Sequence, residues 1–207
     1  TLVLDQLPPS GEWKTLVHSA AQMLPISKGA MPNISLWLRA GQETSLQVEL
    51  RISSKPFNHT PDQTLETVEL PLHAGEQEVT LAFKCRIPSD CYAFVCFIKN
   101  EHVALQTCNS IVSGVMATFN KCLPAVSNWG KQEPPAHIGV ESFEFWCPER
   151  REKAYNIAMK ITPGLRCFAP ENLLAPPYRP VNKPNAWVAT LHDKQPALTF
   201  TWENERQ

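Results

Sequence analysis

The stretch TSLQVELRI, residues 44–52, decides the fold class of this 207-residue chain. Leu46, Val48, Leu50 and Ile52 alternate with Gln47, Glu49 and Arg51. In a β-strand successive side chains point to opposite faces, so this alternation predicts a strand with one face on a core and one face in water.

Other segments repeat the strand pattern at intervals of about ten residues, a spacing typical of antiparallel sandwiches. Nineteen prolines against eight glycines argue against long helices and suit short strands joined by stiff loops. The further strands that we expect are 34–40, 67–72, 79–83, 111–119, 142–146, 155–161, 186–190 and 197–202.

The run CYAFVCFI, residues 91–98, is apolar without alternation. Such a run fits a strand that is covered on both faces, at the centre of a sandwich. Together the patterns predict an all-β chain, an antiparallel jelly-roll-like β-sandwich with a second, smaller β block.

The character of the chain changes after residue 122, where LPAVSNWGKQEPPAHIG is polar, rich in proline and without periodicity. We therefore expect a β-sandwich domain over 1–122 and a linker or long connection over 123–139. Residues 140–207 form the second block, which is thin for an independent sandwich and is either incomplete or packed on the first.

The charge of the chain excludes some partners. The formal net charge is −1, so no basic field gathers phosphates, and we expect neither a nucleic-acid partner nor an anionic membrane surface. No apolar run reaches the ~18 residues of a membrane span, and the first residues, TLVLDQLPPSGEW, do not read as a signal peptide.

The sequence carries no recognisable catalytic or cofactor motif. It lacks G-x-G-x-x-G, G-x-S-x-G and a P-loop, so we expect no FAD or NAD held by a glycine turn, no other cofactor and no catalytic residue. Seven cysteines without a C-x-x-C pair, and six histidines without H-x-H or H-x-x-x-H spacing, predict reduced apolar thiols and no metal site.

Two groups of residues are candidates for ligand binding. Trp146 and Arg150 lie in FEFWCPERR, and Arg179, Asn185 and Trp187 lie in a proline-rich segment. An aromatic face beside arginine and asparagine side chains is what a sugar site offers. For each group taken alone the structural alternative is favoured: Trp146 belongs to the core and Arg150 forms surface ion pairs, and the asparagines satisfy the backbone of a stiff loop.

The order TPDQTLETVEL, GEQEVTLAF, CYAFVCFIKN resembles the C-terminal β-rich region of certain bacterial FAD-dependent oxidoreductases, often linked with carbohydrate use. FEFWCPERR and RPVNKPNAWVATLHDKQPALTFTW resemble the same region, and the latter is also similar to the opening of galactose-binding-like sandwich modules. The resemblance covers about residues 13–202 and lacks the flavin-binding part, so no flavin-contacting residue carries over. It implies an accessory module attached to a parent enzyme or flavoprotein domain.

These observations lead to one expected function and two alternatives. We expect a non-catalytic β-sandwich accessory module of a larger enzyme, with a carbohydrate as its ligand. The alternatives are a β-sandwich hydrolase acting on a glycan or ester, for which Glu141, Glu144 and Glu149 are the nearest carboxylates, and an assembly domain. Burial of Trp146 and Trp187 discriminates: if both were fully buried, the binding hypothesis would lose its basis.

Overall fold

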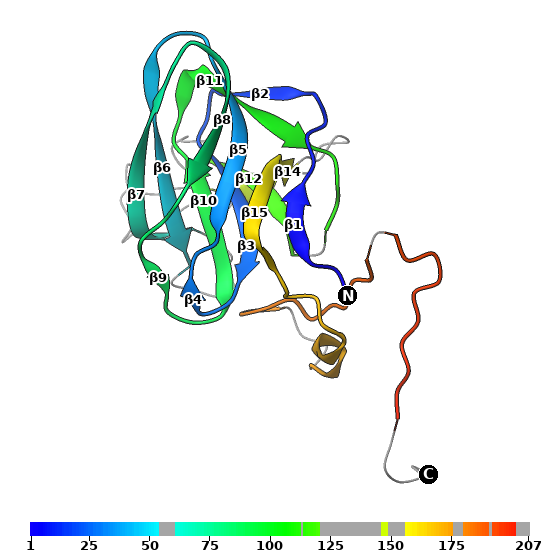
Figure 1. Ribbon diagram of the computed structural model, residues 1–207. Helices are drawn as coiled ribbons and strands as arrows, with labels where there is room; N and C mark the ends of the chain where they lie inside the picture. The colour runs from blue at the N-terminus through cyan, green and yellow to red at the C-terminus, as the bar shows by residue number, and fades with distance from the viewer. Residues whose placement is uncertain are drawn as a thin grey trace, which may run out of the picture.

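A computed structural model of the chain describes residues 1–53, 61–112, 114–120, 146–148, 156–175, 180–190 and 192–201. In this part of the chain two antiparallel sheets pack face to face, and no α-helix occurs (Figure 1). The predicted all-β antiparallel sandwich is therefore confirmed. A small pair, β4 (Gly29–Ala30) with β9 (Arg86–Ile87), closes one end.

The first sheet has seven strands and follows the order β1-β15-β5-β11-β14, with β2 added on β11 and β8 on β5. Its strands are β1 (Leu4–Leu7), β2 (Trp13–Leu16), β5 (Asn33–Ala40), β8 (Gly75–Leu81), β11 (Asn100–Cys108), β14 (Asn156–Ile157) and β15 (Met159–Leu165).

The second sheet has six strands in the order β13-β12-β3-β10-β6-β7. Its strands are β3 (Ala20–Ile26), β6 (Thr44–Ile52), β7 (Gln63–Leu72), β10 (Cys91–Phe97), β12 (Met116–Asn120) and β13 (Trp146–Pro148).

Strand β6 occupies the residues that the alternation predicts and lies between β10 and β7. Leu46, Val48 and Leu50 belong to the main core. The opposite face of β6 is not simply solvated, because Glu49 and Arg51 are buried there as an ion pair with 2.6 Å between Oε2 and Nε.

Strand β10 is covered on both faces, as its sequence predicts. Its inward residues Ala93, Val95 and Phe97 belong to the main core, whereas Tyr92, Phe94 and Cys96 belong to a second buried cluster with Ala21 and Met23 of β3. β3 is likewise buried at all seven positions, so its sequence AAQMLPI shows no alternation, and we did not predict it as a strand.

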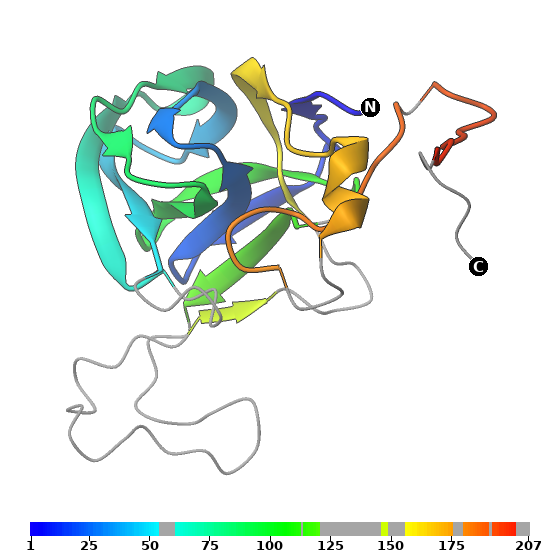
Figure 2. The same ribbon diagram turned by 90° about the horizontal axis from the view of Figure 1, so that it is seen from below.

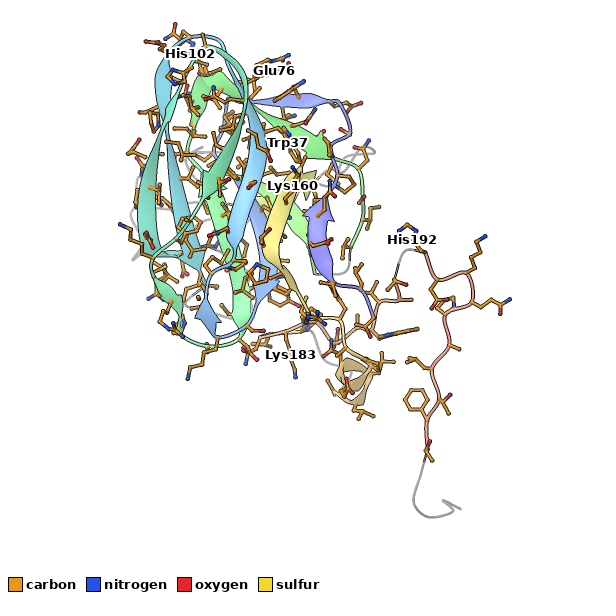
Figure 3. All side chains as sticks on the ribbon, in the orientation of Figure 1. Trp37, Glu76, His102, Lys160, Lys183 and His192 are labelled. Carbon is orange, nitrogen blue, oxygen red and sulfur yellow. The ribbon has the colours of Figure 1, made fainter. Side chains whose placement is uncertain are left out.

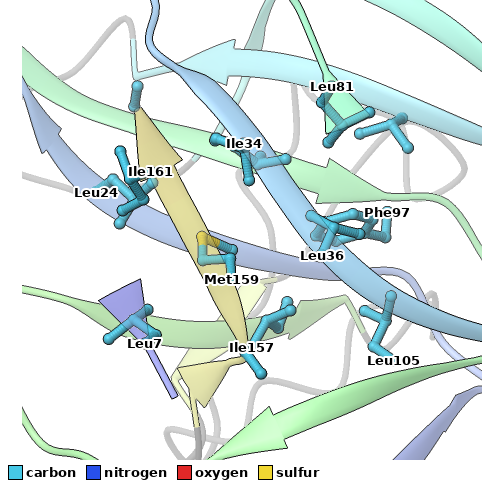
Figure 4. Close-up of a cluster of buried hydrophobic side chains, with 14 of the residues drawn as sticks. Leu7, Leu24, Ile34, Leu36, Leu81, Phe97, Leu105, Ile157, Met159 and Ile161 are labelled. Atoms are coloured by element: carbon cyan, nitrogen blue, oxygen red, sulfur yellow. The ribbon is translucent and has the colours of Figure 1, made fainter. Parts of the chain in front are cut away.

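The main core fills the space between the sheets (Figure 4). Its largest fully buried side chains come from both sheets, which makes the core one continuous apolar layer; they include Leu7, Leu24, Ile34, Leu36, Phe97 and Phe168. Burial of this kind stabilises the fold by about 25 cal/mol for each Å² of apolar surface removed from water.

The late part of the chain is built into the first sheet. β15 pairs with β5 on one side and with β1 on the other, and β14 pairs with the end of β11. The described strands of the predicted block 140–207 therefore share sheets with strands of 1–122. The boundaries of the predicted linker 123–139 lie in residues outside the described part, so that division stays a prediction.

Two expected strands are corrected by the structure. Residues 186–190 form no strand: Val188 makes only single backbone hydrogen bonds, to Phe168 and Leu2. Residues 197–201 form none either, and the segment 192–201 extends away from the sandwich (Figure 1). Alternating residues alone do not make a strand, because a strand also needs a continuous ladder of backbone hydrogen bonds to a neighbouring strand.

Candidate functional site

A pocket of about 250 Å³ lies at the end of the sandwich where β3 ends and β10 begins. Seen from below, this end carries the short helix η3 (Pro170–Leu174) and the strap, by which we mean residues 180–190 (Figure 2). The pocket is lined by Pro25, Ile26, Ser27, Asp90, Arg166, Cys167, Ala169, Glu171, Asn172, Asn182 and Lys183.

Backbone hydrogen bonds fasten the strap to the sandwich. The Val188 N–H donates to the Phe168 carbonyl at 3.4 Å, and the Leu2 N–H donates to the Val188 carbonyl at 2.8 Å. Phe168 is fully buried, so its hydrogen bond attaches the middle of the strap to the core of the sandwich. Pro180 and Pro184 restrict the backbone of the strap itself.

The side chain of Asn172 joins the strap to the wall of the pocket. Its Nδ2 donates to the Cys167 carbonyl at 2.7 Å and to the Ala186 carbonyl at 3.0 Å. Asn172 is 6% exposed, and a buried amide with both N–H groups satisfied is a rigid link. One side chain thus holds together three segments that line or support the pocket.

The wall of the pocket combines an apolar floor with charged sides. Pro25 and Ile26 are buried, while Asp90, Arg166 and Lys183 are exposed at the rim. Asp90 is held in position because its Oδ1 accepts a hydrogen bond from the Lys28 N–H at 2.9 Å. Figure 3 shows Lys183 at this end of the molecule.

The size of the pocket limits its ligand. Pockets for drug-sized molecules enclose about 300–1,000 Å³, so 250 Å³ suits one small ring better than an extended oligomer. An apolar floor with a few convergent polar groups is the usual construction of a small-molecule site.

The thiols near this end are poor nucleophiles. Burial raises the pKa of Cys167 and the pKa of Cys91 to about 11. Because the thiolate is the reactive form, a raised pKa argues against a catalytic cysteine at the pocket.

The structure brings only part of the predicted binding residues to this end. Asn185 and Trp187 lie on the strap and are half-buried, and neither lines the pocket. The backbone of Trp146 pairs with Asn120 in β13, and its side chain lies outside the described part of the structure. Arg150 and Arg179 also lie outside it, as do Glu141, Glu144 and Glu149.

Sequence reasoning missed most of the pocket. Asn182 and Lys183 belong to the proline-rich segment that the sequence singles out, whereas Asp90 and Arg166 lie in loops, and Glu171 in η3, without such a sign. Only the pairing of β3 with β10 and the position of β15 bring these loops together, and neither can be inferred from local patterns.

Two other tryptophans lie on the outer face of the first sheet. The Lys160 Nζ lies 5.0 Å from the ring centroid of Trp37, and the guanidinium carbon of Arg39 lies 4.9 Å from that of Trp13. Trp37 and Lys160 are seen side by side in Figure 3. Because a cation already lies over each ring, a sugar would have to displace it, and we interpret this face as structural.

Comparison with protein-family models, curated proteins and solved structures gives no match. Within the described ranges, no three His, Cys, Asp or Glu side chains are grouped so that they could hold a metal ion. No helix of these ranges is long and apolar enough to cross a membrane.

Proposed function

We propose that this chain is a non-catalytic β-sandwich accessory module of a larger enzyme, and that it binds carbohydrate at the end of the sandwich beside the strap. The observation that carries the proposal is the pocket itself: a small hollow with an apolar floor, ringed by charged and amide side chains. Sugars offer hydroxyl groups to such side chains and C–H faces to apolar surface.

The strap supports the proposal from the side of the aromatic residues. Trp187 is half-buried, so part of its ring surface remains available to a ligand that extends beyond the pocket. Asn185 is half-buried two residues away. Tryptophan with planar polar neighbours is a common sugar-binding combination, because the ring supplies a flat apolar face.

The parent enzyme in this proposal is a flavoprotein linked with carbohydrate use, as the sequence resemblance implies. The chain itself supplies no glycine turn for a dinucleotide. Its contribution would be to hold the parent enzyme near a glycan, which raises the local concentration of substrate without any chemistry in this module.

A glycan-binding screen tests the proposal, with isothermal titration calorimetry on each hit. We expect binding by the intact chain and a loss of at least about tenfold in Trp187→Ala or Lys183→Ala. The matched control is Trp13→Ala, since Trp13 is also half-buried but lies on β2, on the outer face of the first sheet and not on the strap. It should bind as the wild type does.

Two results would contradict the proposal. Absence of binding to every sugar in the screen, by a protein whose thermal unfolding is normal, would leave only a structural or assembly role. Release of reducing ends or free acid from glycans or esters during the same incubations would favour the hydrolase alternative.

A further inference from the structure

The two N–H groups of the Asn172 side chain fix the orientation of its amide. Both bonds run to backbone carbonyl oxygens, those of Cys167 and Ala186, and a carbonyl oxygen can only accept. The nitrogen must therefore face these carbonyls, and Oδ1 occupies the remaining position. The usual ambiguity between the oxygen and nitrogen of an amide does not arise here.

The Oδ1 atom of Asn172 is left without a donor. No described residue donates a hydrogen bond to it, and it is not one of the described buried atoms that lack a partner, so it stays open to solvent in the pocket that Asn172 lines. A ligand that displaces this solvent must replace its hydrogen bond, because desolvation of a polar atom without a partner costs about 1–3 kcal/mol. An acceptor held rigidly in a pocket wall is a position for a ligand donor.

The charges around Asn172 restrict what that ligand is. Asp90 and Glu171 are acceptors, and Arg166 and Lys183 are donors. Two carboxylates and two cations have formal charges that cancel, so the pocket has no net field to attract an anion. A ligand that satisfies both sets must donate and accept hydrogen bonds, which a hydroxyl group does and a carboxylate does not.

We propose that the pocket takes the ring of a neutral sugar, with Asn172 Oδ1 accepting a hydrogen bond from one ring hydroxyl, and that it discriminates against acidic sugars. This inference rests on the proposed carbohydrate binding and names the ligand class and the residue that selects it. Asn172 then has two functions, since its Nδ2 fixes the strap while its Oδ1 reads the ligand.

Calorimetry with methyl glycosides of galactose, glucose and mannose, and with glucuronate and N-acetylneuraminate, tests the ligand class. We expect the best neutral glycoside to bind at least about tenfold more tightly than either acid, because a carboxylate can accept from Arg166 and Lys183 but has no hydrogen to donate to Asn172, Asp90 or Glu171. Tighter binding of an acid would overturn the inference and leave the proposed function standing. Failure of every sugar to bind would instead remove the proposed function itself.

A series of monodeoxy analogues of the best glycoside tests the residue. In the wild type, one deoxy position should weaken binding about 10- to 100-fold, since it leaves Oδ1 unsatisfied. In Asn172→Ala that penalty should disappear, whereas in the control Thr190→Ala, at an exposed position of the same strap outside the pocket lining, it should persist. An equal loss of affinity for the deoxy analogue in all three proteins would exclude Asn172 as the residue that accepts the hydrogen bond from this hydroxyl.

Because Asn172→Ala also removes the link to the strap, a second measurement uses the wild type alone. The ¹⁵N–¹H resonances of the Asn172 side-chain amide should shift when the neutral glycoside is added. When its deoxy analogue is added instead, they should stay at the positions of the ligand-free protein. No shift under saturating neutral glycoside would overturn the assignment whatever the variant does.

Discussion

Gln22 of β3 donates from Nε2 to Oδ1 of Asn156 of β14 at 3.1 Å, across 134 residues of chain. The Oε1 of the same Gln22 accepts the Ile157 N–H at 2.8 Å, and the Asn156 Nδ2 donates to the Ser110 carbonyl at 2.8 Å. Gln22 is fully buried, so this small polar network joins the two sheets inside the apolar core.

Replacing Gln22 by Ala should lower the free energy of unfolding by about 3 kcal/mol, because it leaves the Ile157 N–H and the Asn156 amide buried without a partner. Urea unfolding measures the change.

A double-mutant cycle of Gln22→Ala with Asn156→Ala should show a coupling energy of about 1 kcal/mol or more between the two side chains. Gln6→Ala, at an exposed position of β1, is the control and should change stability by less than about 0.5 kcal/mol. Additive effects of the two core substitutions would contradict the network.

Glu66 of β7 should make stability depend on pH. Its Oε2 accepts the Cys85 N–H at 2.7 Å and the Lys84 N–H at 2.8 Å, and the Cys85 bond is the main cause that lowers the pKa of this carboxyl below its ordinary 4.5. A lowered folded-state pKa means that the stabilising contribution is present above the unfolded-state value and is lost as the pH falls through the folded-state value.

Glu66→Gln should therefore be less stable than the wild type at pH 7, by about 1 kcal/mol, because the side chain is partly exposed and the charge-assisted bonds are screened. The difference should shrink once the pH falls below 4.5, the ordinary pKa of the carboxyl. Thermal unfolding between neutral and acidic pH checks this. Glu69→Gln, exposed on the same strand, is the control and should change stability by less than about 0.5 kcal/mol at pH 7. A constant difference for Glu66→Gln at every pH would refute the explanation.

Gly164 of β15 has no room for a side chain. A Cβ at this position would lie 2.7 Å from Val3 Cγ1 and 2.9 Å from Asp5 Cβ, closer than real contacts allow. We expect Gly164→Ala to cost about 2 kcal/mol, since β1 or β15 must shift to admit the methyl group. The control is Gly41→Ala, whose Cβ would meet only the His102 carbonyl at 3.8 Å. Equal denaturation midpoints for the two variants would contradict the prediction, because they would show that β1 can shift to admit the methyl group at no cost in stability.

How far the sequence predicts this molecule depends on the range of the interactions. The alternation of residues 44–52 identifies β6 to the residue, because that signal is local. The same rule fails for β3, whose two faces are both buried, and overpredicts 197–202, whose described residues have no neighbouring strand. The pocket could not be predicted for a related reason. Asp90 and Lys183 line the same pocket only because of the strand topology, and only the proline-rich strap had a recognisable local sequence pattern.

The Cys167 thiol, which lines the pocket, should react slowly with alkylating reagents. Burial raises its pKa from 9.0 to about 11, so at pH 8 the thiolate fraction is about a hundredfold lower than for an ordinary thiol. We expect the native rate of iodoacetamide labelling, followed on the peptide by mass spectrometry, to fall by about that factor relative to protein in denaturant.

Steric protection alone would give a similar reduction in rate, so the pH dependence of the labelling rate is the decisive measurement. The native rate should keep rising about tenfold per pH unit beyond pH 9.0 and level off only near 11, whereas the denatured rate should level off near 9.0. Matching profiles in the two states would mean that the thiol is shielded and not desolvated.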